Sequence, residues 1–220
     1  MNRVRVKICG VRSLEEAEAA AECGADALGF NFWPKSPRYI TSEAAHDIIA
    51  ALPPFVASVG VFVNEELKAI EAVASDLGLA AVQLHGDESP EFCASLLVRK
   101  TIKAVRVSEG FEPQSIKLYP VDMILLDTGS PGRYGGTGKT FDWGLAAECA
   151  RLGPIILAGG LTPENVVEAI TTVRPAAVDV CSGVETEPGR KDLDKLRNFM
   201  LAVADANTFL QREKHGASNR

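Results

Sequence analysis

Two side chains at the ends of apolar segments could carry out acid–base chemistry. Asp127 directly follows the apolar run 123–126, so its carboxyl group is expected to be partly removed from water. Burial favours the protonated form of a carboxyl group, and that form can donate a proton. Cys9 ends the alternating stretch 4–9, where a thiolate could accept one. The alternatives are an aspartate that caps a helix or lies in a loop and a cysteine that serves only as a small buried residue.

Two glycine-containing sites could bind a phosphate group. Gly159-Gly160 and Ser182-Gly183 each follow a short apolar segment near the C-terminus. Glycine lets backbone N–H groups approach an anion with no side chain in the way. The alternative is a pair of ordinary turns. That alternative is weaker, because both glycine clusters fall at the same end of the predicted fold.

Three further residues are candidates, each with a simpler alternative. Arg38 lies in the proline-rich segment 33–39 and could bind a carboxylate, although a solvated arginine is equally compatible with the spacing. His85 follows the short apolar segment 81–84. The segment 132–140, GRYGGTGKT, resembles a P-loop but has Arg133 where the first glycine is required, so a loop is the better interpretation.

Strand-like and helix-like segments alternate along the chain and would position these residues. Eight β-branched or alternating segments predict strands at 4–9, 27–32, 55–63, 81–84, 101–107, 122–126, 154–158 and 176–180. Helical periodicity or capping signals lie between them, most weakly at 113–119, and a last helix is predicted over 192–203. This alternation predicts a (β/α)₈ TIM barrel, and a doubly wound open sheet is the competing architecture.

The predicted barrel is a single domain spanning residues 1–205. Residues 206–220 are polar and lack periodicity, so a frayed tail is expected there. Active sites of such barrels lie at the carboxyl ends of the strands. Cys9 on the first strand and Asp127 on the sixth would then face each other across the mouth, as a base and an acid acting on one ligand. The two glycine clusters would follow strands seven and eight, the usual phosphate position.

Two charged side chains are expected to pair inside the barrel. Lys7 shares the inward face of the first strand with Cys9, and Asp179 shares that of the eighth strand with Cys181. The first and eighth strands are neighbours where the barrel closes, and an unpaired charge at that depth would be costly. We therefore expect the Lys7 ammonium group to lie within ion-pair distance of Asp179, where its charge would also favour the Cys9 thiolate.

Composition excludes several other classes of protein. The 220 residues are 46% hydrophobic and carry a formal net charge of −6, which argues against nucleic acid as a partner. No apolar run approaches 18 residues and no signal-peptide pattern is present, so a soluble, cytoplasmic protein with no membrane partner is expected. Five dispersed cysteines without metal-ligand spacing argue against both a disulfide framework and a metal site.

Eight motifs, in order, resemble the phosphoribosylanthranilate isomerase family. They are KICG at 7–10, GFNFWPKSPRY at 29–39, GVFVN at 60–64, QLHG at 83–86, LLDT at 125–128, GGTGKTFDW at 135–143, LAGGLTPENV at 157–166 and DVCSGVE at 179–185. The resemblance extends nearly to Phe199. One departure is Cys181, where a small residue such as serine is expected.

The resemblance implies an isomerase of tryptophan biosynthesis that needs no cofactor. It implies conversion of N-(5-phosphoribosyl)anthranilate to 1-(2-carboxyphenylamino)-1-deoxyribulose 5-phosphate by an Amadori rearrangement. Asp127 matches the general acid and Cys9 the general base, and Arg38 matches the residue that faces the anthranilate carboxylate. The expected substrate-binding residues are Arg38, His85, Gly159, Gly160, Asp179, Ser182 and Gly183.

Two other functions stay open at this point. The related aminoimidazole-carboxamide ribonucleotide isomerase would have an aspartate in place of Cys9 and a two-fold internal repeat, and neither is visible in the sequence. A non-catalytic barrel that binds a phosphorylated ligand would not need both Cys9 and Asp127. The expected partner is a phosphorylated small molecule, and the chain is expected to be a monomer or a homodimer.

Overall fold

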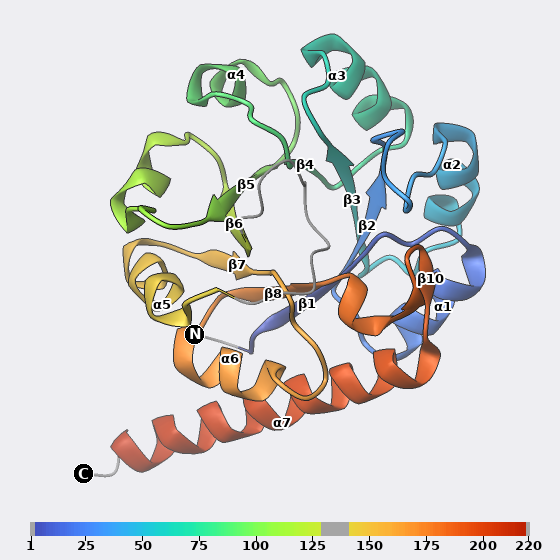
Figure 1. The fold of residues 1–220 in the computed structure, drawn as a ribbon. Helices are drawn as coiled ribbons and strands as arrows, with labels where there is room; N and C mark the ends of the chain where they lie inside the picture. The colour runs from blue at the N-terminus through green and yellow to red at the C-terminus, as the bar shows by residue number, and fades with distance from the viewer. Residues whose placement is uncertain (1–2, 129–140, 219–220) are drawn as a thin grey trace.

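Eight parallel strands close into a barrel in which each strand pairs with the next and β8 pairs with β1 (Figure 1). This is a computed structural model that describes residues 3–128 and 141–218. The strands are β1 (Arg5–Cys9), β2 (Ala27–Asn31), β3 (Ala57–Phe62), β4 (Ala81–Leu84), β5 (Thr101–Val107), β6 (Met123–Thr128), β7 (Ile155–Leu157) and β8 (Ala177–Val180). The predicted order of eight strands is confirmed, with ends that differ by at most two residues.

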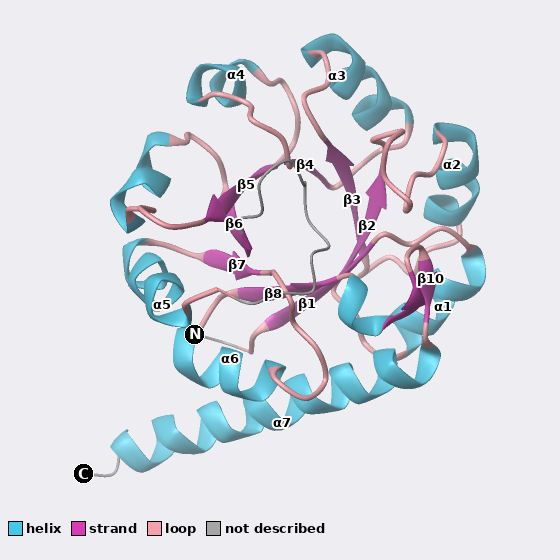
Figure 2. Ribbon diagram, in the orientation of Figure 1, coloured by secondary structure: helices cyan, strands magenta, loops and turns pink. Residues whose placement is uncertain are grey.

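Helices form an outer ring around the strands (Figure 2). They are α1 (Leu14–Glu22), α2 (Ser42–Ala50), α3 (Leu67–Asp76), α4 (Pro90–Ser95), α5 (Trp143–Leu152), α6 (Val166–Val173) and α7 (Leu193–Ser218). Between β5 and β6 the weak helical signal corresponds to the 3₁₀ helix η1 (Pro113–Leu118). A helical segment thus follows every strand, and the (β/α)₈ barrel is confirmed.

Apolar residues form two cores that leave one end of the barrel for polar groups. The larger core lies between strands and helices and includes Val4, Val6 and Ile8 of β1. The smaller core fills the barrel interior, with Val59, Ile102, Ala104, Leu125, Ile156, Ala158 and Ala177. Because side chains alternate along a strand, Lys7 and Cys9 of β1 point to the inside. Both are buried, as the alternation in the sequence predicted.

The C-terminal residues correct one expectation. Residues 206–220 were expected to be frayed, but α7 continues without a break to Ser218. Ala206 extends the buried stripe of this helix, and the Asn207 side chain bonds both the N–H and the C=O of Val4, at 2.6 and 3.1 Å. Arg174 also pairs with Glu213 at 2.6 Å. These contacts are polar, so hydrophobic periodicity does not reveal them.

A short hairpin after β8 was not predicted. The 3₁₀ helix η2 (Ser182–Val184) leads into β9 (Glu185–Glu187), which pairs antiparallel with β10 (Arg190–Lys191). The register places Lys191 opposite Glu185. Gly189 adopts a φ of 89° in the connecting turn, a conformation that favours glycine. Strands of three and two residues are too short to show a period.

Candidate active site

A cavity lies at the carboxyl ends of the strands. It brings together nearly all of the residues singled out in the sequence. The lining residues are Cys9, Asn31, Ser36, Arg38, Val61, Val63, His85, Asp127, Ala158, Gly159, Gly160, Leu161, Asp179, Val180, Cys181 and Ser182. Gly183 is the one candidate outside this lining.

Cys9 ends β1 in an environment that favours its thiolate. The Cys181 side chain lies within hydrogen-bonding reach of the Cys9 sulfur, and the Lys7 ammonium group lies next to that sulfur. The Cys181 sulfur also lies 3.7 Å from Glu185 Oε1. The Cys181 hydrogen bond and the Lys7 charge together hold the pKa of Cys9 well below its usual value, against the opposing effect of burial. The pKa of Cys181 is raised by the neighbouring Cys9 and by burial, so Cys181 is the thiol that keeps its proton.

A neighbouring glycine makes room for the Cys9 side chain. A Cβ atom at Gly29 of β2 would lie 2.8 Å from the Cys9 sulfur and 2.9 Å from Lys7 Nζ. Any larger residue at this position would therefore displace the thiol and the ammonium group.

Lys7 and Asp179 form the predicted ion pair. They are register partners on β1 and β8, and Lys7 Nζ lies 2.8 Å from Asp179 Oδ1, so this prediction is confirmed. Burial raises the pKa of Asp179 to about 6, with Lys7 acting in the opposite direction. Burial alone would lower the pKa of Lys7, but the charges of Asp179 and Cys9 raise it. Both groups are therefore charged at neutral pH.

Asp127 shares a hydrogen bond with His85. Asp127 Oδ2 lies 3.2 Å from His85 Nε2, and Oδ1 accepts the N–H of Thr128 at 2.8 Å. The Gln83 amide nitrogen lies 2.8 Å from Nδ1 on the other side of the imidazole ring. Gly159, with a φ of 83°, lets the loop after β7 pass closely, because a Cβ there would lie 3.0 Å from Asp127 Oδ1. The carboxyl group is thus fixed on both oxygens at the edge of the cavity.

The loops after β7 and β8 provide glycine-rich backbone next to the cavity. Gly159 and Gly160 both adopt positive φ, at 83° and 64°. Gly183 lies behind this surface, where a Cβ would come within 1.9 Å of the Leu161 carbonyl oxygen. Its missing side chain thus lets the two loops pack together. Ser182 lines the cavity at the start of η2. Residues 132–140, the P-loop-like segment, lie outside the described residues.

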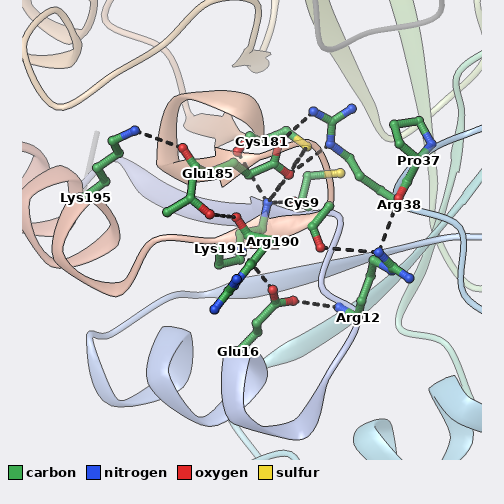
Figure 3. Close-up of polar contacts among 12 residues, drawn as sticks. Cys9, Arg12, Glu16, Pro37, Arg38, Cys181, Glu185, Arg190, Lys191 and Lys195 are labelled. Carbon is green, nitrogen blue, oxygen red and sulfur yellow. Dashed lines mark hydrogen bonds and ion pairs between the residues drawn. The ribbon is translucent and has the colours of Figure 1, made fainter.

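Arg38 reaches the cavity from the β2–α2 loop and is held by a partner that sequence reasoning missed. Its Nε and Nη2 atoms donate to the two carboxylate oxygens of Glu185, at 2.9 and 2.7 Å (Figure 3). Glu185 also accepts from Lys191 at 3.0 Å. Gly10, with a φ of 77°, leaves space for Arg38, since a Cβ there would lie 2.9 Å from Arg38 Cδ.

Glu185 and Lys191 were not predicted from the sequence, and the sequence gives different indications of the two. Glu185 ends the DVCSGVE motif, so it could have been considered. Lys191 lies in the hairpin strand β10, and nothing in its sequence neighbourhood indicates that its ammonium group bonds the Cys9 carbonyl oxygen at 2.6 Å.

The arrangement supports acid–base chemistry on an anionic ligand. Cys9 of β1 lines the cavity in surroundings that favour its thiolate, and Asp127 of β6 lines it with a fixed carboxyl group. Arg38, in the loop after β2, adds a positive charge to the lining. Within the described residues, no cluster of three or more histidine, cysteine, aspartate or glutamate side chains is arranged to hold a metal ion.

Comparison with known proteins identifies the relatives of this chain. The family model described as N-(5'-phosphoribosyl)anthranilate (PRA) isomerase matches residues 6–202. The N-(5'-phosphoribosyl)anthranilate isomerase of Geobacter metallireducens is 54% identical over 197 residues, covering 90% of this chain and 97% of the relative. That of Thermotoga maritima is 53% identical over 199 residues, covering 90% and 97%.

Solved structures give the same relationship. One is a phosphoribosylanthranilate isomerase in complex with reduced 1-(o-carboxyphenylamino)-1-deoxyribulose 5-phosphate. It is 47% identical, with a TM-score of 0.83, and the match covers 92% of this chain and 99% of that one. The enzyme of Thermus thermophilus is 39% identical, with a TM-score of 0.84 and coverage of 92% and 99%.

Proposed function

Because this chain belongs to the N-(5'-phosphoribosyl)anthranilate isomerase family, we propose that Cys9 and Asp127 are the base and the acid of its reaction. The chain is an isomerase of tryptophan biosynthesis that converts N-(5'-phosphoribosyl)anthranilate to 1-(2-carboxyphenylamino)-1-deoxyribulose 5-phosphate. The single observation that supports the two roles best is that both groups line one cavity, each with the hydrogen-bond partners its role requires.

Asp127 opens the sugar ring in this proposal. Its carboxyl proton passes to the furanose oxygen as the bond from that oxygen to C1′ breaks, and the nitrogen lone pair forms the C1′=N bond of a Schiff base. The Gln83 amide nitrogen can only donate, so His85 Nδ1 accepts from it and the neutral imidazole donates its Nε2 proton to Asp127 Oδ2 at 3.2 Å. This hydrogen bond orients the carboxyl group toward the cavity. Such positioned proton transfer contributes about 10²–10⁴-fold to a rate.

Cys9 then removes the proton from C2′. The electrons of that C–H bond form the C1′=C2′ bond, and the positive charge on nitrogen is neutralised. The resulting enolamine becomes the ketone when the C2′ hydroxyl group loses its proton and C1′ gains one. The lowered pKa of Cys9 supports this role, because only the thiolate can accept a proton.

The remaining candidates bind the two anionic ends of the substrate. Gly159, Gly160, Ser182 and Gly183 are proposed to form the phosphate site, supported by the positive φ of the first two and by the close contact of the two loops. Arg38 is proposed to bind the anthranilate carboxylate. Asp179 contributes indirectly through Lys7, which it holds beside Cys9.

Substitution of Asp127 by asparagine tests the proposal. Asparagine keeps the shape and the hydrogen bonds but has no transferable proton, so kcat should fall by about 10²–10⁴-fold. Loss of substrate fluorescence measures kcat, and thermal unfolding should give an unchanged Tm. A large fall in Tm would make Asp127 a structural residue, and no substrate consumption by the unaltered chain would favour a barrel that only binds its ligand.

A cytoplasmic location and a monomeric or homodimeric state complete the proposal. Among the described helices, none has the length and apolar character to cross a bilayer. A Thermotoga maritima relative is a dimeric phosphoribosylanthranilate isomerase from which monomers have been generated. Light scattering coupled to gel filtration measures the state of this chain.

A further inference from the structure

Three buried charged groups form one cluster behind the cavity. Glu185 and Lys191 face each other across the β9–β10 hairpin, and their side chains are 3% and 0% exposed. Arg38 joins them from the β2–α2 loop with 11% exposed. Two cations and one carboxylate leave the cluster with a net positive charge. Of the three, Arg38 is the one that lines the cavity, so its guanidinium group presents that charge to a ligand.

Glu185 occupies one particular edge of the Arg38 guanidinium group. It accepts from Nε and from Nη2, which is the side edge of the fork. A guanidinium group has five N–H donors, and this pairing uses two of them. One hydrogen of Nη1 and the second hydrogen of Nη2 form the end edge, and the other Nη1 hydrogen points back toward Cδ. That edge has the parallel geometry that suits a second carboxylate bound through two hydrogen bonds.

Several contacts fix the position of Glu185 itself. Lys191 donates to its Oε1 at 3.0 Å, and Lys195 of α7 donates to its backbone carbonyl at 2.9 Å. The Lys191 backbone N–H donates in turn to Glu16 of α1 at 2.8 Å (Figure 3). These contacts fix Glu185 in place, so its carboxylate holds the Arg38 guanidinium group in one position. Lys191 also prevents Glu185 from cancelling the positive charge that Arg38 needs to attract an anion.

We propose that Glu185 is a positioning residue that directs the Nη1–Nη2 edge of Arg38 toward the substrate, and so sets the preference for a ligand with an aryl carboxylate. This inference rests on the proposed binding role of Arg38. Glu185 does not line the cavity, and it acts on the substrate carboxylate through Arg38, while its other contact near the cavity is with the Cys181 sulfur at 3.7 Å. Removing its charge lets the guanidinium group rotate about its long side chain, which weakens recognition of the carboxylate while Cys9 and Asp127 stay in place.

The test compares the affinities of two ligands. One is reduced 1-(o-carboxyphenylamino)-1-deoxyribulose 5-phosphate, and the other is the corresponding phenylamino compound without the carboxyl group. Calorimetry gives Kd for both, and their ratio measures carboxylate preference. Glu185→Gln should reduce this ratio roughly tenfold, which corresponds to the weakening of one charge-assisted hydrogen bond. With substrate, KM should rise while kcat changes little.

Three variants make the result specific. Arg38→Met should lose the preference, and Arg38→Met/Glu185→Gln should show the same ratio as Arg38→Met alone, because Glu185 acts through Arg38. Glu187→Gln is the matched control, since Glu187 is exposed on the same hairpin and should keep the full preference. If Glu185→Gln unfolds because Lys191 is left unpaired, Glu185→Gln/Lys191→Met removes the buried cation and should show the reduced ratio.

Two outcomes would overturn the inference. A folded Glu185 variant with the original ratio would leave Glu185 as a counter-ion only, and an equal loss of affinity for both ligands would indicate general damage to the site. Loss of the ratio in Arg38→Met supports the role of Arg38 independently of Glu185. Failure of the unaltered chain to consume substrate would instead contradict the proposed catalytic roles, which the two binding measurements do not involve.

Discussion

Two buried lysine–carboxylate pairs at the same end of the barrel have different surroundings. Lys7 of β1 pairs with Asp179 of β8, and Lys103 of β5 pairs with Glu88 of the β4–α4 loop. Both N–O distances are 2.8 Å, and all four side chains are less than one-tenth exposed. Their surroundings, rather than their geometry, separate a structural pair from one that can assist chemistry.

The Lys103 pair is satisfied by backbone and carboxylate groups. Lys103 Nζ donates to Glu88 and to the carbonyl oxygens of Leu84 and Gly86. Glu88 accepts in turn from the N–H groups of Asn64 and Gly86. Neither member of the pair lines the cavity. The pair thus holds the loop after β4, which carries His85, in one conformation.

The Lys7 pair instead lies beside Cys9, the proposed base. Lys7 interacts with Cys9 as well as with Asp179, and its charge lowers the pKa of that thiol. Cys93 is the counterpart near Lys103, and there burial prevails and raises the thiol pKa. A buried ammonium group whose donors are all taken up by backbone carbonyls and a carboxylate fixes structure. One that keeps a donor for a neighbouring thiol can also tune its ionisation.

Removal of the Cys9 thiol should have the largest effect of the variants considered. Cys9→Ala eliminates the proposed base, so kcat should fall by about 10²–10⁴-fold, as measured by loss of substrate fluorescence. Binding of the reduced product analogue should persist, because the base acts only as charge develops in the transition state. If more than about a tenth of kcat remained, Cys9 would not be the base.

Removal of the other lysine should affect stability instead. Lys103→Met leaves Glu88 buried without its cation, which should lower the free energy of unfolding by about 3–5 kcal/mol. Urea denaturation measures this change. Lys103→Met/Glu88→Gln provides the control, since the neutral pair should recover part of the loss. A folded single variant of unchanged stability would contradict the structural role.

Removal of the Lys7 pair should shift the pH dependence of the reaction. The active form of Cys9 is the thiolate, which is present above its pKa. Lys7→Met/Asp179→Asn removes the cation that lowers this pKa while leaving no unpaired charge. The acidic limb of kcat/KM should therefore move to higher pH, by about 1–3 pH units. An unmoved limb would mean that the Cys181 hydrogen bond and the Lys191 charge lower the pKa of Cys9 without a contribution from Lys7.

The parts of the site that the sequence predicts are those fixed by strand alternation. Lys7 and Asp179 could be paired in advance because each points into the barrel near a strand end and the barrel closes between β1 and β8. Cys9 and Asp127 could be placed at one mouth for the same reason, since all carboxyl ends of the strands lie there.

The parts that the sequence does not reveal depend on short or irregular segments. Glu185 and Lys191 meet across a hairpin of only a few residues, which has no measurable period. Glu88 contributes from a loop, so its pairing with Lys103 could not be inferred from alternation alone. Asn207 anchors α7 through two hydrogen bonds to Val4, and such polar contacts leave no hydrophobic signal.

The two thiols near the two lysines should react with an alkylating agent at different rates, which is the smallest effect expected. Iodoacetamide attacks the thiolate form, and an ordinary thiol is only a few per cent ionised at pH 7. Cys9 and Cys93 are both buried, at 8% and 4% exposed, and their pKa values are shifted in opposite directions. Peptide mapping should show Cys9 modified at least about tenfold faster than Cys93. The reduced product analogue should protect Cys9 and leave Cys93 unaffected, because Cys9 lines the cavity and Cys93 does not. Equal rates for the two thiols would mean that Lys7 does not favour the thiolate of Cys9 more than Lys103 favours that of Cys93.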